Sequence, residues 1–273
     1  MLPGGVLAIT SSDYDGRGIM KFVAARSDSD PQALAACRAS SLAARLFEWP
    51  AGLALTNDGL LVCNAYPSRS PTALYKFAKD GSMDALATVP ALAVYDRGFT
   101  RCAVHQQTQR TYAIGEDEEE NHVLVLLDAN LQVVATVEDT GGAPEDDDNE
   151  PLRDVAVHGD QVIVLTSDHH PKGSGLRLLD LDGQLLRTIA AGQFQNPQAV
   201  AASRGRAFVV DNDNEPGKVL HVIDIQSGDI IQRVRVYPLI GDVTAALVDG
   251  NEIFIADHQA DRVVVLQFPG SEV

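Results

Sequence analysis

The chain has 273 residues, of which 45% are hydrophobic and 22% charged, so it is long enough to bury a sizeable core. Its 38 acidic residues exceed its 21 Lys and Arg and give a net charge of −17, a field that repels phosphate backbones, so no nucleic-acid partner is expected. No apolar run approaches the roughly 20 residues that span a bilayer, so no membrane partner is expected either.

The N-terminal segment, 6–38, predicts an incomplete unit of structure. Apolar runs at 6–9 and 19–23 predict two strands, and a third strand or a short helix is expected around 32–37. No basic segment followed by a long apolar stretch precedes them, so no secretory signal is expected. The three cysteines, Cys37, Cys63 and Cys102, are odd in number and far apart, which argues against a disulfide framework. Together these features predict a soluble, cytoplasmic protein.

A short apolar phrase recurs along the rest of the chain. The segment Phe208–Asn212 is similar to Phe254–His258, and weaker copies are centred on three earlier residues, Val62, Ala113 and Val164. With Val209 and Ile255 as the equivalent positions, the spacings are 51, 51, 45 and 46 residues. A period of roughly 40–50 residues built from short apolar runs is typical of propeller blades.

Each period contains four short apolar runs, which we name strands a to d. In 197–236 these runs are rich in Val and Ile and are separated by Gly, Asn and Asp clusters, as strands of a meander are. Complete units are predicted at 50–89, 99–137, 152–190 and 197–236, and partial units at 6–38 and 243–268. The sequence therefore predicts an all-β, six-bladed β-propeller with four-stranded blades, incomplete first and last blades, and one domain spanning 1–273.

The phrase from Gly192 to Pro197, followed by a strand, a Gly turn and Phe208–Asp211, resembles an NHL repeat. The stretches from Trp49 to Ala54 and from Ile255 to Val263 resemble the same phrase. The resemblance implies a six-bladed propeller, but it specifies no task, because one fold hosts unrelated functions.

Acidic residues concentrate in the loops between strands b and c and between strand d and the next strand a. The b–c loops carry Asp13, Asp15, the acidic run 116–120, Asp168, Asp211, Asp213, Glu215, Asp257 and Asp261, and one d–a loop carries Glu138, Asp139 and the run 145–150. In a propeller both kinds of loop emerge on one face. The pattern predicts either a surface for a protein or basic peptide partner, or solvated loops that keep the chain soluble.

Within these loops, Asp211, Asp213 and Glu215 form the best candidate for a calcium site, because hard cations prefer several oxygens at alternate loop positions. The alternative is structural: an Asp just after strand b ties the b–c turn to its own backbone. The seven histidines show no zinc-ligand spacing and are expected mainly in exposed loops. No cofactor is expected, with Ca²⁺ as the only candidate.

Relatives of the gluconolactonase type hold a divalent metal on the channel axis through Glu, Asn and Asp side chains near strand starts. The equivalent positions here carry neither carboxylate nor Asn: Ala51, Thr100, Arg153, Gln198 and Thr244. Glu48, Asp154 and Asp242 lie close to them in sequence. The peptide-amidating lyase resembles the chain in repeat pattern alone, and no GxSxG or P-loop motif occurs.

The leading hypothesis is a non-enzymatic, NHL-like propeller that binds a partner through its acidic loop face. The candidate binding residues at the channel mouth and in the acidic loops are Arg153, Asp154, Gln198, Asp211, Asp213, Asp242 and Asp257. The alternative is a metal-dependent hydrolase or lyase with Glu48, Asp154 and Asp242 near the axis.

Overall fold

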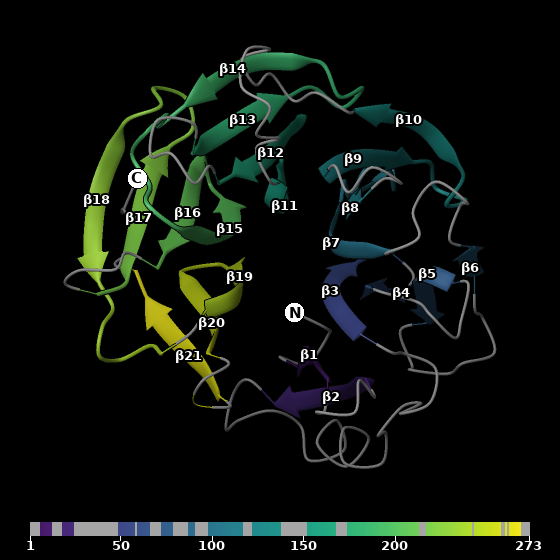
Figure 1. Ribbon diagram of the computed structural model, residues 1–273, viewed down its shortest axis with the longest axis horizontal. Helices are drawn as coiled ribbons and strands as arrows, with labels where there is room; N and C mark the ends of the chain where they lie inside the picture. Colours follow the sequence, from purple (N-terminus) through teal and green to yellow (C-terminus); the bar gives the residue numbers. More distant parts are fainter. Residues whose placement is uncertain are drawn as a thin grey trace. The chain divides into compact units, whose positions relative to one another are not determined.

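The computed structural model describes 6–12, 18–24, 49–57, 59–65, 72–78, 87–90, 98–116, 122–137, 152–167, 174–212, 217–241, 243–257, 260 and 262–268. These residues contain the strands β1 to β21 (Figure 1). A search of the described residues for an apolar helix of membrane-spanning length finds none.

The strands pair as antiparallel sheets of consecutive segments. One sheet has two strands, β1 (Val6–Ser12) and β2 (Gly18–Ala24). Four sheets have four strands each: β3 (Trp49–Leu55), β4 (Gly59–Ala65), β5 (Thr72–Ala78) and β6 (Ala87–Pro90); β7 (Phe99–Val104), β8 (Thr111–Glu116), β9 (His122–Leu127) and β10 (Val133–Val137); β11 (Leu152–His158), β12 (Gln161–Thr166), β13 (Gly175–Leu179) and β14 (Leu185–Ile189); and β15 (Pro197–Ser203), β16 (Arg206–Asp211), β17 (Val219–Asp224) and β18 (Ile230–Arg235). The last sheet has three strands, β19 (Val243–Asp249), β20 (Glu252–Asp257) and β21 (Arg262–Gln267).

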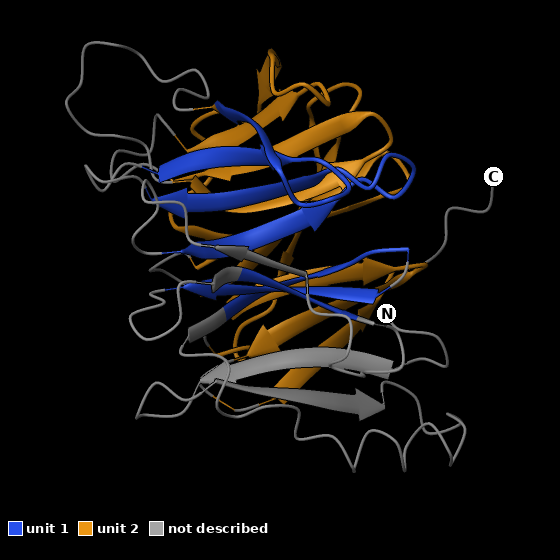
Figure 2. Ribbon diagram, turned by 90° about the vertical axis from the view of Figure 1, so that its right-hand side faces the viewer, with its two compact units in different colours: residues 1–136 blue, residues 137–273 orange. Residues whose placement is uncertain are grey.

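The chain divides into two compact units, Met1–Thr136 and Val137–Val273, which Figure 2 colours separately. Unit 1 contains the two-stranded sheet and two four-stranded sheets. Unit 2 contains the other two four-stranded sheets and the three-stranded one. Each unit is described below by itself, and a single domain over 1–273 stays a prediction.

The prediction of six blades is wrong, because the described residues form five blades of three or four strands. The four complete units lie where the repeats predicted them, and the partial unit at 243–268 is the three-stranded blade. The segment at the N-terminus supplies a single hairpin, in which Val6 pairs with Ala24 and Ser12 with Gly18. Two strands have too little surface to form a blade of their own. The third element expected around 32–37 lies outside the described residues.

Burial within a blade follows the order of its strands. Every residue of β4 is buried, and β8, β12 and β16 are each buried except for one terminal residue. The fourth strands β14 and β18 are largely exposed. This is why the second strands read as continuous apolar runs and produce the strongest repeat signal, since a strand covered on both faces has no polar side.

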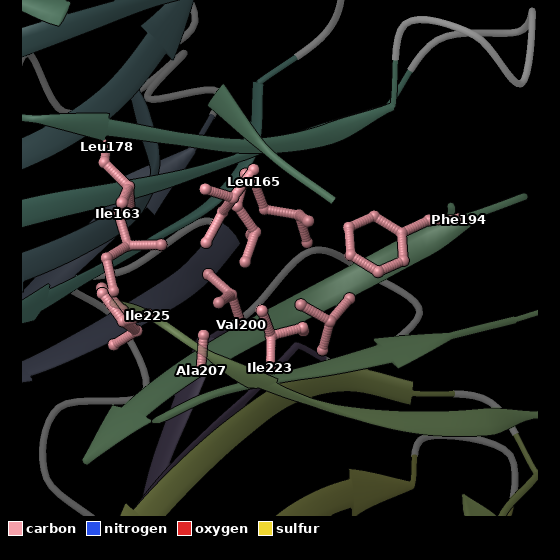
Figure 3. Packing of buried hydrophobic residues seen from close by; sticks show 12 residues of the cluster. Ile163, Leu165, Leu178, Phe194, Val200, Ala207, Ile223 and Ile225 are labelled. Carbon is pink, nitrogen blue, oxygen red and sulfur yellow. The ribbon is translucent and has the colours of Figure 1, made fainter. Parts of the chain in front are cut away.

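The cores lie between neighbouring blades. In unit 2, one cluster combines Ile163, Leu165 and Leu178 of the β11–β14 blade with Val200 and Ile223 of the next blade (Figure 3). The ring of Phe194, which is fully buried, points into this cluster from the loop before β15 (Figure 3). Burying such a side chain contributes on the order of 2–3 kcal/mol, so these interfaces hold the blades of the unit together.

Candidate functional site

A β-bulge recurs at one position in the first strand of every blade. The pairing skips a single residue in β3, β7, β11, β15 and β19. The five skipped residues are Ala51, Thr100, Arg153, Gln198 and Thr244, the same five positions that the sequence singles out just inside strand a. A bulge takes a residue out of the ladder and re-aims its side chain, and bulges are common beside functional sites.

In unit 2 the bulged residues Arg153, Gln198 and Thr244 lie on three strands that follow one another in space, because β15 contacts both β11 and β19. The side chains of Arg153 and Gln198 are half-buried and Thr244 is exposed. The Gln198 amide donates to the side-chain oxygen of Asn196 at 2.6 Å and to its carbonyl at 3.2 Å. The three bulged residues, which we call the bulge row, are therefore all polar, with one cation and no carboxylate.

Asp154 follows the bulge in β11 and is 7% exposed. Its Oδ1 accepts the backbone N–H of Val155 at 2.9 Å, and its Oδ2 accepts the backbone N–H of Val200 at 2.8 Å. Val200 belongs to the first strand of the next blade. The carboxylate therefore bridges two blades, and the structure gives this sequence-predicted site residue a structural contact.

Asp211, at the end of β16, is 2% exposed. Its Oδ1 accepts the N–H of Asn196 at 2.7 Å and its Oδ2 accepts the N–H of Gln195 at 3.0 Å. Asn212 then donates its N–H to the Asn196 carbonyl at 3.0 Å. The structural alternative expected Asp211 to bond to the backbone of its own b–c turn. Asp211 does bond to backbone, but to the d–a loop that enters β15, 15 and 16 residues earlier in the chain.

Asp257 repeats this arrangement in the last blade. It is 2% exposed, and its Oδ2 accepts the N–H of Gly241 in the loop before β19 at 3.0 Å. The same oxygen is 3.1 Å from Nε of Arg262, whose guanidinium also donates to the Leu239 carbonyl. The recurring Asp at the end of the second strand is thus an anchor for the loop that precedes its blade.

The NHL-like phrase around Phe194 is explained by the same loop. The Ser174 hydroxyl donates to the Phe194 carbonyl at 2.6 Å, and the Gly192 N–H donates to the Ser174 carbonyl at 2.7 Å. Phe194 fills the inter-blade core while Asp211 accepts the next two N–H groups. The aromatic residue and the following polar pair are therefore required by packing and by backbone hydrogen bonding.

His221 is a buried polar residue that the sequence analysis did not single out. It is 4% exposed, its ring meets Phe194 edge-on at a centroid distance of 5.2 Å, and its Nε2 lies 3.5 Å from Oδ2 of Asp211. The signal was a polar residue inside the apolar run of β17. The equivalent position in β13 is Arg177, because Arg177 pairs with Val164 as His221 pairs with Val209. Arg177 is also buried.

The other sequence-predicted site residues, Asp213, Glu215, Asp242 and Glu48, lie outside the described residues, as do most of the acidic loops. Among the residues that the structure describes, no group of three or more His, Cys, Asp or Glu side chains is arranged to hold a metal ion. Two of the three cysteines, Cys63 and Cys102, are described, and both are buried.

Comparison with known protein families and with curated proteins gives no match. Solved structures do match. Nidogen in its complex with laminin aligns with a TM-score of 0.65 at 11% identity, over 96% of this chain and 89% of that one. A protein from Thermus thermophilus described as an oxidoreductase (glucose dehydrogenase) aligns with a TM-score of 0.57 at 18% identity, over 83% and 81%. The PQQ-bound aldose sugar dehydrogenase of Streptomyces coelicolor aligns with a TM-score of 0.57 at 14% identity, over 81% and 78%.

Identities this low establish the fold alone. The chain is an all-β β-propeller, with five blades in its described part. Structures of this class include both a binding protein and sugar dehydrogenases, so the function has to be argued from the site.

Proposed function

We propose that this NHL-like propeller is a non-enzymatic binding module that takes a protein or basic peptide partner on its acidic b–c and d–a loops. The surplus of acidic residues behind the net charge of −17 is concentrated in those loops. A negative surface of this kind attracts basic segments and raises their association rate.

The observation that carries the proposal is that the three described aspartates, Asp154, Asp211 and Asp257, are already hydrogen-bonded to the backbone. All three are buried, and all accept backbone N–H groups that hold blades or loops in place. Diverting one of them to a metal ion or a substrate would leave a buried N–H unsatisfied, at a cost of about 1–3 kcal/mol. Aspartates used in this way support a scaffold function, and they leave partner recognition to the other acidic residues of the loops.

The likeness to nidogen, solved in complex with laminin, supports the same function, because it is a propeller-containing protein in a protein complex. A catalytic function, including a metal-dependent hydrolase or lyase, is the second candidate. It is favoured by the repeated bulges, which place Arg153, Gln198 and Thr244 on neighbouring strands. It is weakened because this row offers no carboxylate or imidazole as a general base.

The test compares two variants with the same change in charge. The loop variant carries Asp146→Asn, Asp147→Asn and Asp148→Asn, in the acidic d–a loop. The control variant carries Asp182→Asn, Asp229→Asn and Asp249→Asn, exposed residues of the a–b and c–d turns. The probe is a fluorescent peptide of alternating Lys and Ser, followed by anisotropy at low and at physiological salt.

We expect the loop variant to bind the peptide at least about threefold more weakly and the control variant to bind it like the wild type. The difference should shrink with added salt, because exposed charges are screened beyond roughly 8–10 Å. Equal losses in the two variants, or no binding by the wild type, would contradict the proposal.

A further inference from the structure

The three-stranded blade of unit 2 ends in β21, and among the described strands only β20 pairs with it. In the other two blades of the unit a fourth strand, β14 or β18, covers the third strand, β13 or β17. Figure 1 shows β21 as the last strand of its sheet. It is therefore a third strand without the described neighbour that its equivalents have.

The sequence of β21 is that of a covered strand, but its burial is not. The strand contains four consecutive apolar residues, Val263–Leu266. Val265 is equivalent to Val222 of β17, because each lies three residues after the strand's first residue, which pairs with the last Asp of the second strand. Val222 is 1% exposed, whereas Val265 is 42% exposed. The apolar run of β21 thus suits a neighbour that the described strands do not supply.

The backbone of β21 directs hydrogen-bonding groups outward in a fixed pattern. Phe268 donates its N–H to the Asn251 carbonyl at 2.8 Å, which extends the ladder between β20 and β21 by one pair. Because bonded pairs alternate in an antiparallel ladder, Val263 and Val265 direct their N–H and C=O groups away from β20. The equivalent residues of β17 direct theirs to β18. The outer edge of β21 can therefore accept a strand in the same way.

This edge also lacks the charges that keep edge strands from pairing. In the same unit, the outer strand β18 carries Arg233 and Arg235, and β14 carries Arg187. Between its two terminal residues β21 carries no charge, and its terminal Arg262 is held by Asp257 at 3.1 Å. Charged side chains on an edge strand hinder the addition of another strand, so β21 is the outer strand of this unit best suited to accept one.

The fourth strands of the complete blades show which sequence covers a third strand. Three of them begin with two adjacent aliphatic residues and have another aliphatic residue three positions later: Val133–Val137, Leu185–Ile189 and Ile230–Val234. The last aliphatic residue packs into the core between blades, as Ile189 and Val234 do. These two residues pair with Leu176 and Leu220, whose counterpart in β21 is Val263. A strand that covers β21 therefore needs an aliphatic residue opposite Val263.

We propose that the outer edge of β21 binds an extended segment of a partner protein as an antiparallel fourth strand. The segment has two adjacent aliphatic residues and a third one three positions later, as β14 and β18 have. In such strand addition, main-chain hydrogen bonds supply affinity and alternate side chains supply specificity. A second copy of the chain is a poorer occupant, because two molecules of net charge −17 repel each other. This site uses none of the acidic loop residues and is additional to the proposed function.

The probe is a fluorescent, end-blocked peptide that copies residues 228–236, the sequence of β18 with its flanks. Two N-methylated forms have the same charge and side chains. One is methylated at Gln232 and Val234, whose N–H groups face the third strand in the native blade, and the other at Arg233 and Arg235, whose N–H groups face away. Anisotropy measures binding of each peptide to the full chain, and light scattering measures the mass of the protein alone.

Two protein variants complete the design. Val265→Pro removes an outward N–H without breaking a bond to β20, and Val265→Thr keeps that N–H with a side chain of similar shape. Thermal melting verifies that both are folded. The methylated peptides test the same hydrogen bonds on the unmodified protein, so the result does not depend on the Pro variant.

We expect the wild type and Val265→Thr to bind the unmethylated peptide and the peptide methylated at Arg233 and Arg235. Binding should be at least about tenfold weaker with Val265→Pro, or with methylation at Gln232 and Val234, which corresponds to about 1.4 kcal/mol. Hydrogen exchange of the Val263 and Val265 amides should slow when the peptide is bound.

Equal binding of the two methylated peptides, or undiminished binding to Val265→Pro, would overturn the proposal and leave the acidic loops untested by it. A dimer of the wild type that Val265→Pro abolishes would assign the edge to a second copy of the chain. A monomer that binds no form of the peptide would mean that the chain itself closes the edge. Either of these outcomes would also overturn the proposal.

Discussion

Oδ2 of Asp154 and the backbone N–H of Val200, 46 residues apart, form a 2.8 Å hydrogen bond that joins the first strands of two neighbouring blades. The separation is one residue more than the 45-residue spacing of these two blades. Asp154 also accepts the N–H of Val155 beside it, so one buried carboxylate satisfies two backbone donors. Removing it leaves both donors without this acceptor.

Asp154→Ala is therefore expected to lower the free energy of unfolding by about 2–4 kcal/mol, since each unsatisfied buried donor costs about 1–3 kcal/mol. Asp154→Asn keeps one acceptor oxygen and should lose roughly half as much. Urea unfolding followed by circular dichroism measures both, with the exposed Asp249→Ala as the control. A loss for Asp154→Ala no larger than for Asp249→Ala would show that the bridge contributes nothing.

Phe194 fills the core between the β11–β14 and β15–β18 blades and is fully buried. Phe194→Ala should destabilise the protein by about 3–5 kcal/mol through lost burial and the cavity left behind. Phe194→Leu should cost much less, because it keeps most of the volume. The exposed Leu186→Ala is the control and should change stability by less than about 0.5 kcal/mol. Thermal melts of the three variants rank these effects, and a reversed ranking would refute the packing account.

Gly217 has a φ of 113°, and a Cβ added there would lie 2.5 Å from Cβ of Tyr237. Gly250 also has a positive φ, 60°, but a Cβ there would meet nothing within 4 Å. Gly217→Ala should therefore cost more stability than Gly250→Ala, whose penalty is the backbone strain of roughly 1–2 kcal/mol alone. Unfolding by urea separates the two, and equal losses would mean that the loop yields around Tyr237.

Calcium is not expected to stabilise the protein through Asp211, because both of its oxygens already accept backbone N–H groups. Millimolar Ca²⁺ should leave the melting temperature unchanged within about 1 °C, and a chelator should have no effect. A site filled at 100 times its Kd would instead add about 2.7 kcal/mol of stability. A saturable increase that disappears in Asp213→Asn/Glu215→Gln would establish the calcium site and revive the metal-dependent alternative.

Asp224 closes the turn between β17 and β18 by accepting the Ser227 N–H at 2.8 Å. This backbone hydrogen bond holds the pKa of the carboxyl below its ordinary value, with a smaller effect from the positive charge of Arg206. Because the pKa is lower in the folded state, the stabilisation is complete above the unfolded value of about 4 and is lost as the pH falls through the folded pKa. Asp224→Asn should thus lie below wild type in stability at pH 6 and approach it at about pH 2–3. An equal gap at both values, measured by urea unfolding, would contradict this assignment.

The strands and turns were predictable from the sequence because their signals are local. Continuous apolar runs mark the strands, and Gly, Asn and Asp clusters mark the turns between them, where residues such as Gly183 adopt a positive φ. The four complete blades lie within one residue of their predicted limits at either end. The predicted blade count was wrong because the N-terminal apolar runs were interpreted as strands of a sixth blade, whereas they form a single hairpin.

The sequence by itself thus determined the repeat, the all-β class and the equivalence of five positions just inside the first strands, since each depends on a local pattern of residues. That these five residues form bulges became visible only in the strand pairing. The tertiary structure alone decided what the aspartates do. Asp154 and Asp211 resemble the other acidic residues of the loops in sequence, but each is buried and accepts N–H groups from segments 15–46 residues away. The same distant packing distinguishes the buried Phe194 from the exposed Leu239, because a side chain's exposure is set by the neighbours that folding brings to it.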